Sequence, residues 1–221
     1  MAFRYLLFDL DGTLIDTTDL ILNCYRTSVN TLVADPPTDA EILKGFGTPL
    51  PEQLGRLYPT LSHRLDDLVA MWRQAQDELH DRLIKPFPGT TEVLTELRGR
   101  GYPVGIVTSK ERDAAQRDMA LYGLQRLVDA VVYLDDTTNH KPHPEPVLRA
   151  LELIDARPEE TLYVGDSLHD MRAGRAAGVK VGAALWGPFA KEPLLAFGPD
   201  HLLNSIHDLL DLCPSLDGHR S

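Results

Sequence analysis

Two carboxylates one residue apart, Asp9 and Asp11, are the first residues in this chain whose spacing could do chemistry. They follow residues 5–8 (Tyr-Leu-Leu-Phe), a short apolar run typical of a buried parallel strand. Alternate residues of an extended chain share a face, and Gly12 permits a sharp turn directly afterwards. The pattern therefore predicts a hard-cation site, for which Mg²⁺ is the usual occupant beside phosphate. For the pair alone, a solvated loop or a helix N-cap is the alternative.

A second apolar run, residues 104–107, ends at Thr108 and Ser109. A hydroxyl at the carboxyl end of a strand can donate to a phosphate oxygen, and the backbone N–H groups of a following helix add to such a site. The alternative is that the hydroxyl only caps the helix.

A third run, residues 161–164, leads to Asp166, and Asp170 follows one helical turn later. Residues four apart share a helix face, so both carboxylates can point toward the same place above the carboxyl ends of the strands. The alternative is that Asp166 caps the helix and that Asp170 complements the helix dipole.

Lys141 lies within residues 139–144 (Asn-His-Lys-Pro-His-Pro). Pro142 restricts the backbone of Lys141 to an extended conformation, because its ring disfavours a helical residue before it. A solvated surface lysine is the ordinary alternative.

The segments that must position these side chains alternate between apolar runs and helical patterns. Strands are predicted at 103–107, 130–134, 161–164 and 179–183, and helices at 91–98, 111–121, 145–153, 168–177 and 206–212. Such alternation predicts a parallel sheet covered by helices on both faces, with the first strand, 5–8, in the same sheet. Ligands of such sheets bind at the carboxyl ends of the strands.

Residues 16–84 show a helical pattern with no strand signal. Thr38 and Glu41 have the spacing of a capping box at the start of one helix. We therefore predict an α/β core formed by residues 1–15 and 85–221, with an all-helical cap domain, residues 16–84, inserted into it. An insertion directly after the first acidic loop is positioned to act as a lid.

Composition narrows the class of protein further. The 221 residues are 43% hydrophobic and 25% charged, as in ordinary globular proteins, and the formal net charge is -11. That charge argues against nucleic acid or an anionic membrane as partner. Two isolated cysteines and the lack of a long apolar run predict a reduced, cytoplasmic protein. The tail 213–221 is expected to be frayed.

Four strand-end segments occur in one order along the chain: 9–17, 108–110, 139–144 and 165–170. In that order they resemble the four motifs of the haloacid dehalogenase-like (HAD) phosphatases, and the resemblance extends over nearly the whole chain. It implies a Rossmann-like parallel-sheet core with an inserted helical cap.

The resemblance also implies roles. Asp9 would be the nucleophile that forms an aspartyl phosphate, and Asp11 would be the general acid and base. Thr108, with Ser109, would bind the phosphoryl group, and Lys141 would steady the charge on the nucleophile and on the phosphoryl group.

The resemblance further implies a magnesium ion. The side chains of Asp9 and Asp166 and a backbone carbonyl group near Asp11 would bind this ion. Asp170 would bind the ion or contact one of the groups that bind it. Because Asp11 is an acid, C–Cl dehalogenation is disfavoured, since that branch of the family lacks an acid at this position.

Residues 134–147 resemble the phosphoglycolate phosphatases and, more closely, the related bacterial inorganic pyrophosphatases. The loop 45–50 resembles the substrate-facing cap loop of that group, which makes Gly45, Phe46 and Gly47 candidate substrate-binding residues. The implied substrate is pyrophosphate or a small phosphorylated metabolite such as phosphoglycolate, turned over by a monomer or homodimer. A sugar-phosphate mutase and a non-catalytic phospho-ligand sensor are the alternatives.

Overall fold

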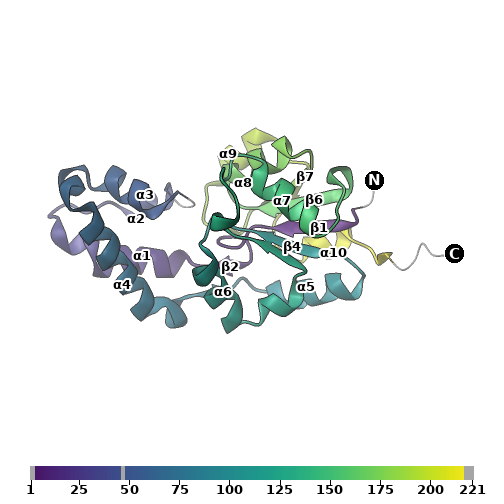
Figure 1. Ribbon diagram of the computed structural model, residues 1–221, viewed down its shortest axis with the longest axis horizontal. Helices are drawn as coiled ribbons and strands as arrows, with labels where there is room; N and C mark the ends of the chain where they lie inside the picture. Colours follow the sequence, from purple (N-terminus) through teal and green to yellow (C-terminus); the bar gives the residue numbers. More distant parts are fainter. Residues whose placement is uncertain (1–2, 46–47, 217–221) are drawn as a thin grey trace. The chain divides into compact units, whose positions relative to one another are not determined.

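The computed structural model describes residues 3–45 and 48–216. Within the chain two compact units form, Met1–Asp16 with Pro86–Ser221, and Thr17–Lys85. We call the first the core unit and the second the helical unit, and each is described by itself (Figure 1).

The core unit is built on a six-stranded parallel sheet in the order β5-β4-β1-β6-β7-β8. The strands are β1 (Tyr5–Phe8), β4 (Val104–Val107), β5 (Ala130–Val132), β6 (Thr161–Gly165), β7 (Lys180–Ala184) and β8 (His201–Leu203). β1, β4 and β6 are buried almost throughout, because helices cover both faces. The predicted α/β class with a parallel Rossmann-like sheet is confirmed.

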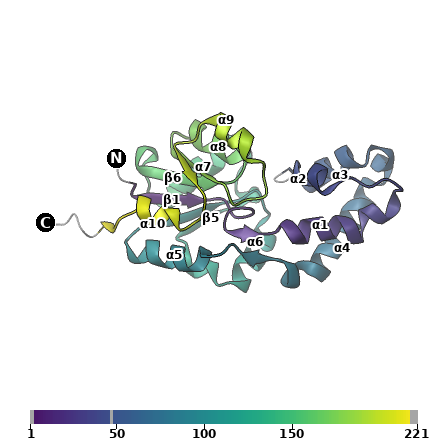
Figure 2. The same ribbon diagram turned by 180° about the vertical axis from the view of Figure 1, so that it is seen from behind.

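Helices lie on both sides of this sheet, as Figures 1 and 2 show from opposite directions. α7 and α8 cover one face, where Leu7 and Tyr163 of the sheet pack with Val147 of α7 and Ala173 of α8. α5 and α10 lie on the other face. The helices of the core unit are α5 (Thr90–Gly99), α6 (Arg112–Leu121), α7 (Glu145–Leu153), α8 (Leu168–Ala176), α9 (Lys191–Phe197) and α10 (Asp208–Leu212).

The helical unit comprises α1 (Thr18–Thr27), α2 (Asp39–Leu43), α3 (Leu50–Leu57) and α4 (Leu65–Leu83), with 3-10 turns at Val29–Leu32 and Pro59–Arg64. Its core contains an aromatic group in which Tyr25 stacks on Tyr58 and meets Trp72 edge-on. The predicted capping box at α2 is confirmed, since Thr38 and Glu41 exchange side-chain and backbone hydrogen bonds.

Several elements differ from the sequence-based expectations. α9, β8 and the two-stranded sheet of β2 (Ile15–Asp16) and β3 (Lys85–Pro86) were not predicted, because elements this short show no periodicity. The strand predicted at 130–134 ends at Val132, because the chain turns into a 3-10 helix at Leu134–Asp136.

The frayed tail predicted from Cys213 onward is wrong for residues 213–216. Cys213 is buried, Arg100 donates to its carbonyl oxygen at 2.8 Å, and Tyr102 donates to the carbonyl oxygen of Pro214 at 2.8 Å. Across residues 3–45 and 48–216, no helix is long and apolar enough to cross a membrane.

Candidate active site

The order of the sheet brings three predicted site residues to one edge. β1 lies between β4 and β6. The chain adds β4 and β5 on one side of β1 before it adds β6, β7 and β8 on the other side. Asp9 follows β1, Thr108 follows β4 and Asp166 follows β6, each directly after the last residue of its strand. The site therefore lies where the strand order reverses, which is the place where open α/β sheets bind ligands.

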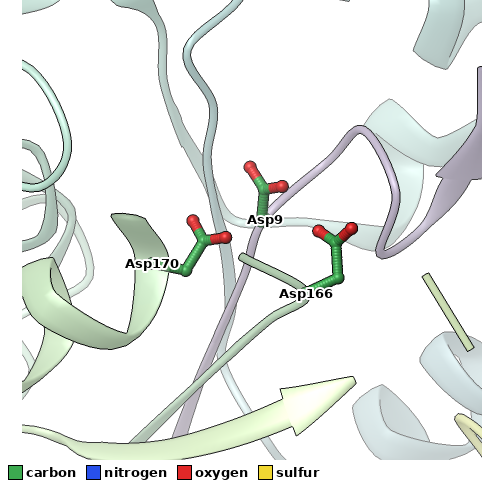
Figure 3. A group of neighbouring side chains, drawn as sticks. All are labelled: Asp9, Asp166 and Asp170. Carbon is green, nitrogen blue, oxygen red and sulfur yellow. The ribbon is translucent and has the colours of Figure 1, made fainter. Parts of the chain in front are cut away.

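Asp9, Asp166 and Asp170 form a buried acidic cluster (Figure 3). One carboxylate oxygen from each lies within 4.8 Å of the others. The Thr13 hydroxyl donates to Asp166 Oδ1 at 3.1 Å, whereas Asp166 Oδ2 is buried without a hydrogen-bond partner. Gly12, with φ +85°, makes the predicted turn beside this carboxylate, and a Cβ there would lie 2.9 Å from Asp166 Oδ1.

Lys141 places its ammonium group inside the cluster and is not a solvated surface lysine. Its Nζ donates to Asp9 Oδ1 at 2.6 Å and to Asp170 Oδ1 at 2.7 Å, and its side chain is 5% exposed. It also donates to the carbonyl oxygen of Val107 at 3.2 Å. Burial opposes the charge of this lysine, but Asp170 and Asp9 outweigh it and raise the pKa of Lys141.

Both oxygens of Asp170 are occupied by protein donors. Tyr163 and Lys141 donate to Oδ1, while the hydroxyl and backbone N–H of Ser167 donate to Oδ2. Asp170 thus completes a capping box at α8, which sequence reasoning did not foresee, and also orients Lys141. Asp166 does not cap α8, because Ser167 is the N-cap.

Full ionisation of the three carboxylates would give the cluster more negative charge than Lys141 balances. Burial, followed by the neighbouring Asp170 carboxylate, raises the pKa of Asp9 to about 7 in spite of Lys141. Burial and the carboxylates of Asp9 and Asp170 raise the pKa of Asp166 well above its usual range. Burial also opposes ionisation of Asp170, but Lys141 and the hydrogen bonds from Ser167 and Tyr163 hold its pKa below the usual range.

This donor set fits a divalent cation. A group of carboxylate oxygens, one of them buried and unpartnered, is the kind of ligand that Mg²⁺ takes in proteins, and an ion there would offset the excess charge. Asp9 and Asp166 are the better ligands, because both Asp170 oxygens already accept hydrogen bonds.

Asp11 lies outside this cluster and pairs with Lys110, which sequence reasoning did not single out. Lys110 Nζ donates to Asp11 Oδ1 at 2.7 Å and also bonds to Asp118, a buried carboxylate of α6. Burial opposes the charge of Lys110, but Asp11 and Asp118 raise its pKa overall. The position of Lys110 directly after Thr108 and Ser109 was the one available signal.

Thr108 is buried at the end of β4, and its Oγ1 accepts the backbone N–H of Lys110 at 3.1 Å. It does not cap α6, whose N-cap residue is Glu111, so the capping alternative fails there. Ser109 is half-buried beside it. The roles of both hydroxyls toward phosphate stay predictions.

In the helical unit, Gly45 is buried, and the side chains of Gln53 and Arg56 fill the space that a Cβ on it would need. Phe46 and Gly47, the other predicted substrate-binding residues, lie outside the described residues.

The raised pKa of Asp9 predicts how stability depends on pH without a cation. The folded protein holds this proton up to about pH 7, while the unfolded chain releases it near pH 3.8, so stability falls as pH rises through that window. We expect the Tm in excess chelator to fall as pH rises from about 4 to about 7, and to fall less in Asp9→Asn. Thermal melts of both proteins across this range test the prediction, and equal slopes would contradict it.

The comparisons with known proteins show the family of the chain. Residues 6–184 match the haloacid dehalogenase-like hydrolase family, and the chain belongs to that family. As predicted from its motifs, it is a phosphatase-type hydrolase of the superfamily.

Curated relatives match nearly the whole chain, and two of them serve as examples. Pyrophosphatase PpaX of Bacillus mycoides is 36% identical over 218 residues, which cover 99% of this chain and 100% of the relative. Pyrophosphatase PpaX of Halalkalibacterium halodurans is 36% identical over 212 residues, covering 96% and 97%. A candidate phosphoglycolate phosphatase from Lactobacillus plantarum has a similar structure, with a TM-score of 0.83, 28% identity and coverage of 96% of this chain and 100% of that one.

Proposed function

We propose that this protein is a Mg²⁺-dependent phosphohydrolase that works through an aspartyl phosphate on Asp9. The observation that supports this most directly is the buried acidic cluster at the strand-order reversal, with Lys141 bonded to Asp9 and one Asp166 oxygen unpartnered. Such a site can hold a cation and a phosphoryl group next to an aspartate nucleophile.

In the first step, a carboxylate oxygen of Asp9 attacks phosphorus, and the bond from phosphorus to the leaving oxygen breaks. Asp11 gives its proton to that oxygen. Lys141 donates to Asp9 Oδ1 and so holds the carboxylate in place. In the second step, water attacks phosphorus, Asp11 takes the water's proton, and the bond from Asp9 to phosphorus breaks.

Fixed positive charge and hydrogen-bond donors stabilise the oxygens of the transferred group. Lys141 is already buried beside the nucleophile, and Thr108 lies at the end of the neighbouring strand. Mg²⁺, bound through Asp9 and Asp166 and a carbonyl near Asp11, would supply further charge compensation when present.

Pyrophosphate is the substrate we propose first, with phosphoglycolate second. The two relatives named above are pyrophosphatases, and the similar Lactobacillus protein is a candidate phosphoglycolate phosphatase. The residues we propose for discriminating between these small anions are Gly45, Phe46 and Gly47.

A turnover assay with Mg²⁺ tests this proposal. Release of phosphate should be fastest from pyrophosphate or phosphoglycolate among a panel of small phosphate compounds. Transfer of the phosphoryl group back to a sugar, without net release of phosphate, would favour the mutase instead. Binding of these anions without turnover would favour the sensor.

The cation proposal makes its own prediction. Activity should require Mg²⁺, and Ca²⁺ should inhibit, because a larger ion with more ligands spoils the geometry of in-line transfer. Asp166→Ala should raise the Mg²⁺ concentration needed for half-maximal activity by about tenfold or more, whereas the exposed Asp113→Ala should not. A metal titration of both variants tests this, and full activity in excess chelator would contradict it.

A further inference from the structure

The loop after β7 reaches into the cluster region through Trp186. Its indole N–H donates to the carbonyl oxygen of Thr13 at 2.9 Å, and the Thr13 hydroxyl donates to Asp166 Oδ1 at 3.1 Å. Two hydrogen bonds therefore link three loops, those that follow β1, β6 and β7. The indole thus fixes the residue that holds one Asp166 oxygen.

Gly187, the next residue, lies directly against Asp166. A Cβ on Gly187 would collide with the Cβ of Asp166, lie 2.5 Å from Asp166 Oδ2 and lie 2.7 Å from the carbonyl oxygen of Gly12. Asp166 is fully buried and the Gly12 oxygen belongs to the backbone, so neither has an easy way to move aside.

Backbone conformation does not account for a glycine at this position. Gly187 is not among the glycines with positive φ, unlike Gly12 on the facing loop. The close approach of the loop to Asp166 is what excludes a side chain.

We propose that Trp186 and Gly187 are positioning residues for the cation site. Gly187 packs against the Asp166 carboxylate, and Trp186 anchors the Thr13 hydroxyl that bonds to it. Together they fix the carboxylate where one oxygen lies within 4.8 Å of oxygens of Asp9 and Asp170. This inference rests on the proposed function, because it gives the loop a role in binding the proposed Mg²⁺.

The test is Mg²⁺ binding, measured without turnover. In isothermal titration with MgCl₂, Gly187→Ala should raise the Kd about tenfold or more, as is typical when a group that orients a metal ligand is lost. Gly99→Ala is the matched control, because nothing lies within 4 Å of a Cβ there, and its Kd should equal that of the parent. Trp186→Phe keeps an aromatic ring but loses the N–H donor, so its Kd should also rise, by a smaller factor.

Thermal melts separate a positioning role from general packing. A packing defect lowers the Tm equally with chelator and with Mg²⁺, whereas a positioning defect also shrinks the rise in Tm that Mg²⁺ produces. Circular dichroism checks that each variant is folded. If Gly187→Ala does not fold, Trp186→Phe decides: a raised Kd supports the proposal and a parental Kd overturns it.

The outcomes separate this inference from the function on which it rests. A parent protein that binds Mg²⁺ and a folded Gly187→Ala that binds it equally well would overturn the role of the loop and leave the proposed function intact. A parent that binds no Mg²⁺ would overturn the cation site itself and the inference with it.

Discussion

Asp9→Asn is expected to lower kcat by about three orders of magnitude or more, as is typical when a covalent nucleophile is lost. An amide cannot attack phosphorus as a carboxylate does, and the variant also loses a charge that Lys141 and the proposed cation both use. The loss should be similar for every substrate that the parent hydrolyses, because the same bond to phosphorus forms in each case.

Steady-state kinetics on pyrophosphate and on p-nitrophenyl phosphate measure this effect. The exposed Asp113→Asn, an identical change on α6, is the control and should keep the parental kcat. Mass spectrometry of the rapidly quenched parent should find phosphate on the peptide that contains Asp9. A folded variant with kcat within about tenfold of the parent would refute the assignment of the nucleophile.

The strands near the centre of the sheet and most helices of the core unit were predictable because their apolar periodicity is strong. β1, β4 and β6 are buried on both faces and appear in the sequence as short apolar runs. β8 and α9 could not be predicted in this way. A three-residue strand and a seven-residue helix bury too few side chains to leave a periodic pattern.

The candidate site likewise contains residues that could be predicted from the sequence and residues that could not. Asp9, Thr108 and Asp166 were accessible to sequence reasoning because each stands directly after a strand, where parallel sheets collect functional groups. The role of Tyr163 could not be predicted from the sequence, because this residue lies inside a strand and its hydroxyl group makes the hydrogen bond to Asp170. The role of Gly187 could not be predicted either, because a close approach between two loops leaves no pattern in a single sequence.

Lys110 bears on the residue that we propose as acid and base. Its ammonium group bonds to Asp11 and to the buried Asp118, 8 residues further along the chain, so it ties the Asp11 carboxylate to α6. An acid that transfers a proton must be positioned as well as ionisable. The sequence offered Asp11 through its motif, but only the three-dimensional structure shows which group orients it.

Asp11→Asn is expected to lower kcat/KM on alkyl phosphates by about a hundredfold or more, within the range typical of general acid catalysis. An alkoxide is a poor leaving group and needs the proton that Asp11 supplies. The loss on p-nitrophenyl phosphate should be much smaller, because nitrophenolate leaves readily without a proton.

The quantity to compare is kcat/KM, because it reports the steps up to the first irreversible one, which is formation of the aspartyl phosphate. In contrast, kcat includes hydrolysis of that intermediate, in which Asp11 acts as base, so kcat should fall on both substrates. Quenched reactions of the variant with p-nitrophenyl phosphate should then contain more phosphorylated Asp9 than those of the parent, because formation of the intermediate is slowed less than its hydrolysis. Equal losses of kcat/KM on alkyl and nitrophenyl substrates would show that Asp11 is not the acid, and would leave it a role in orienting Lys110 or the cation.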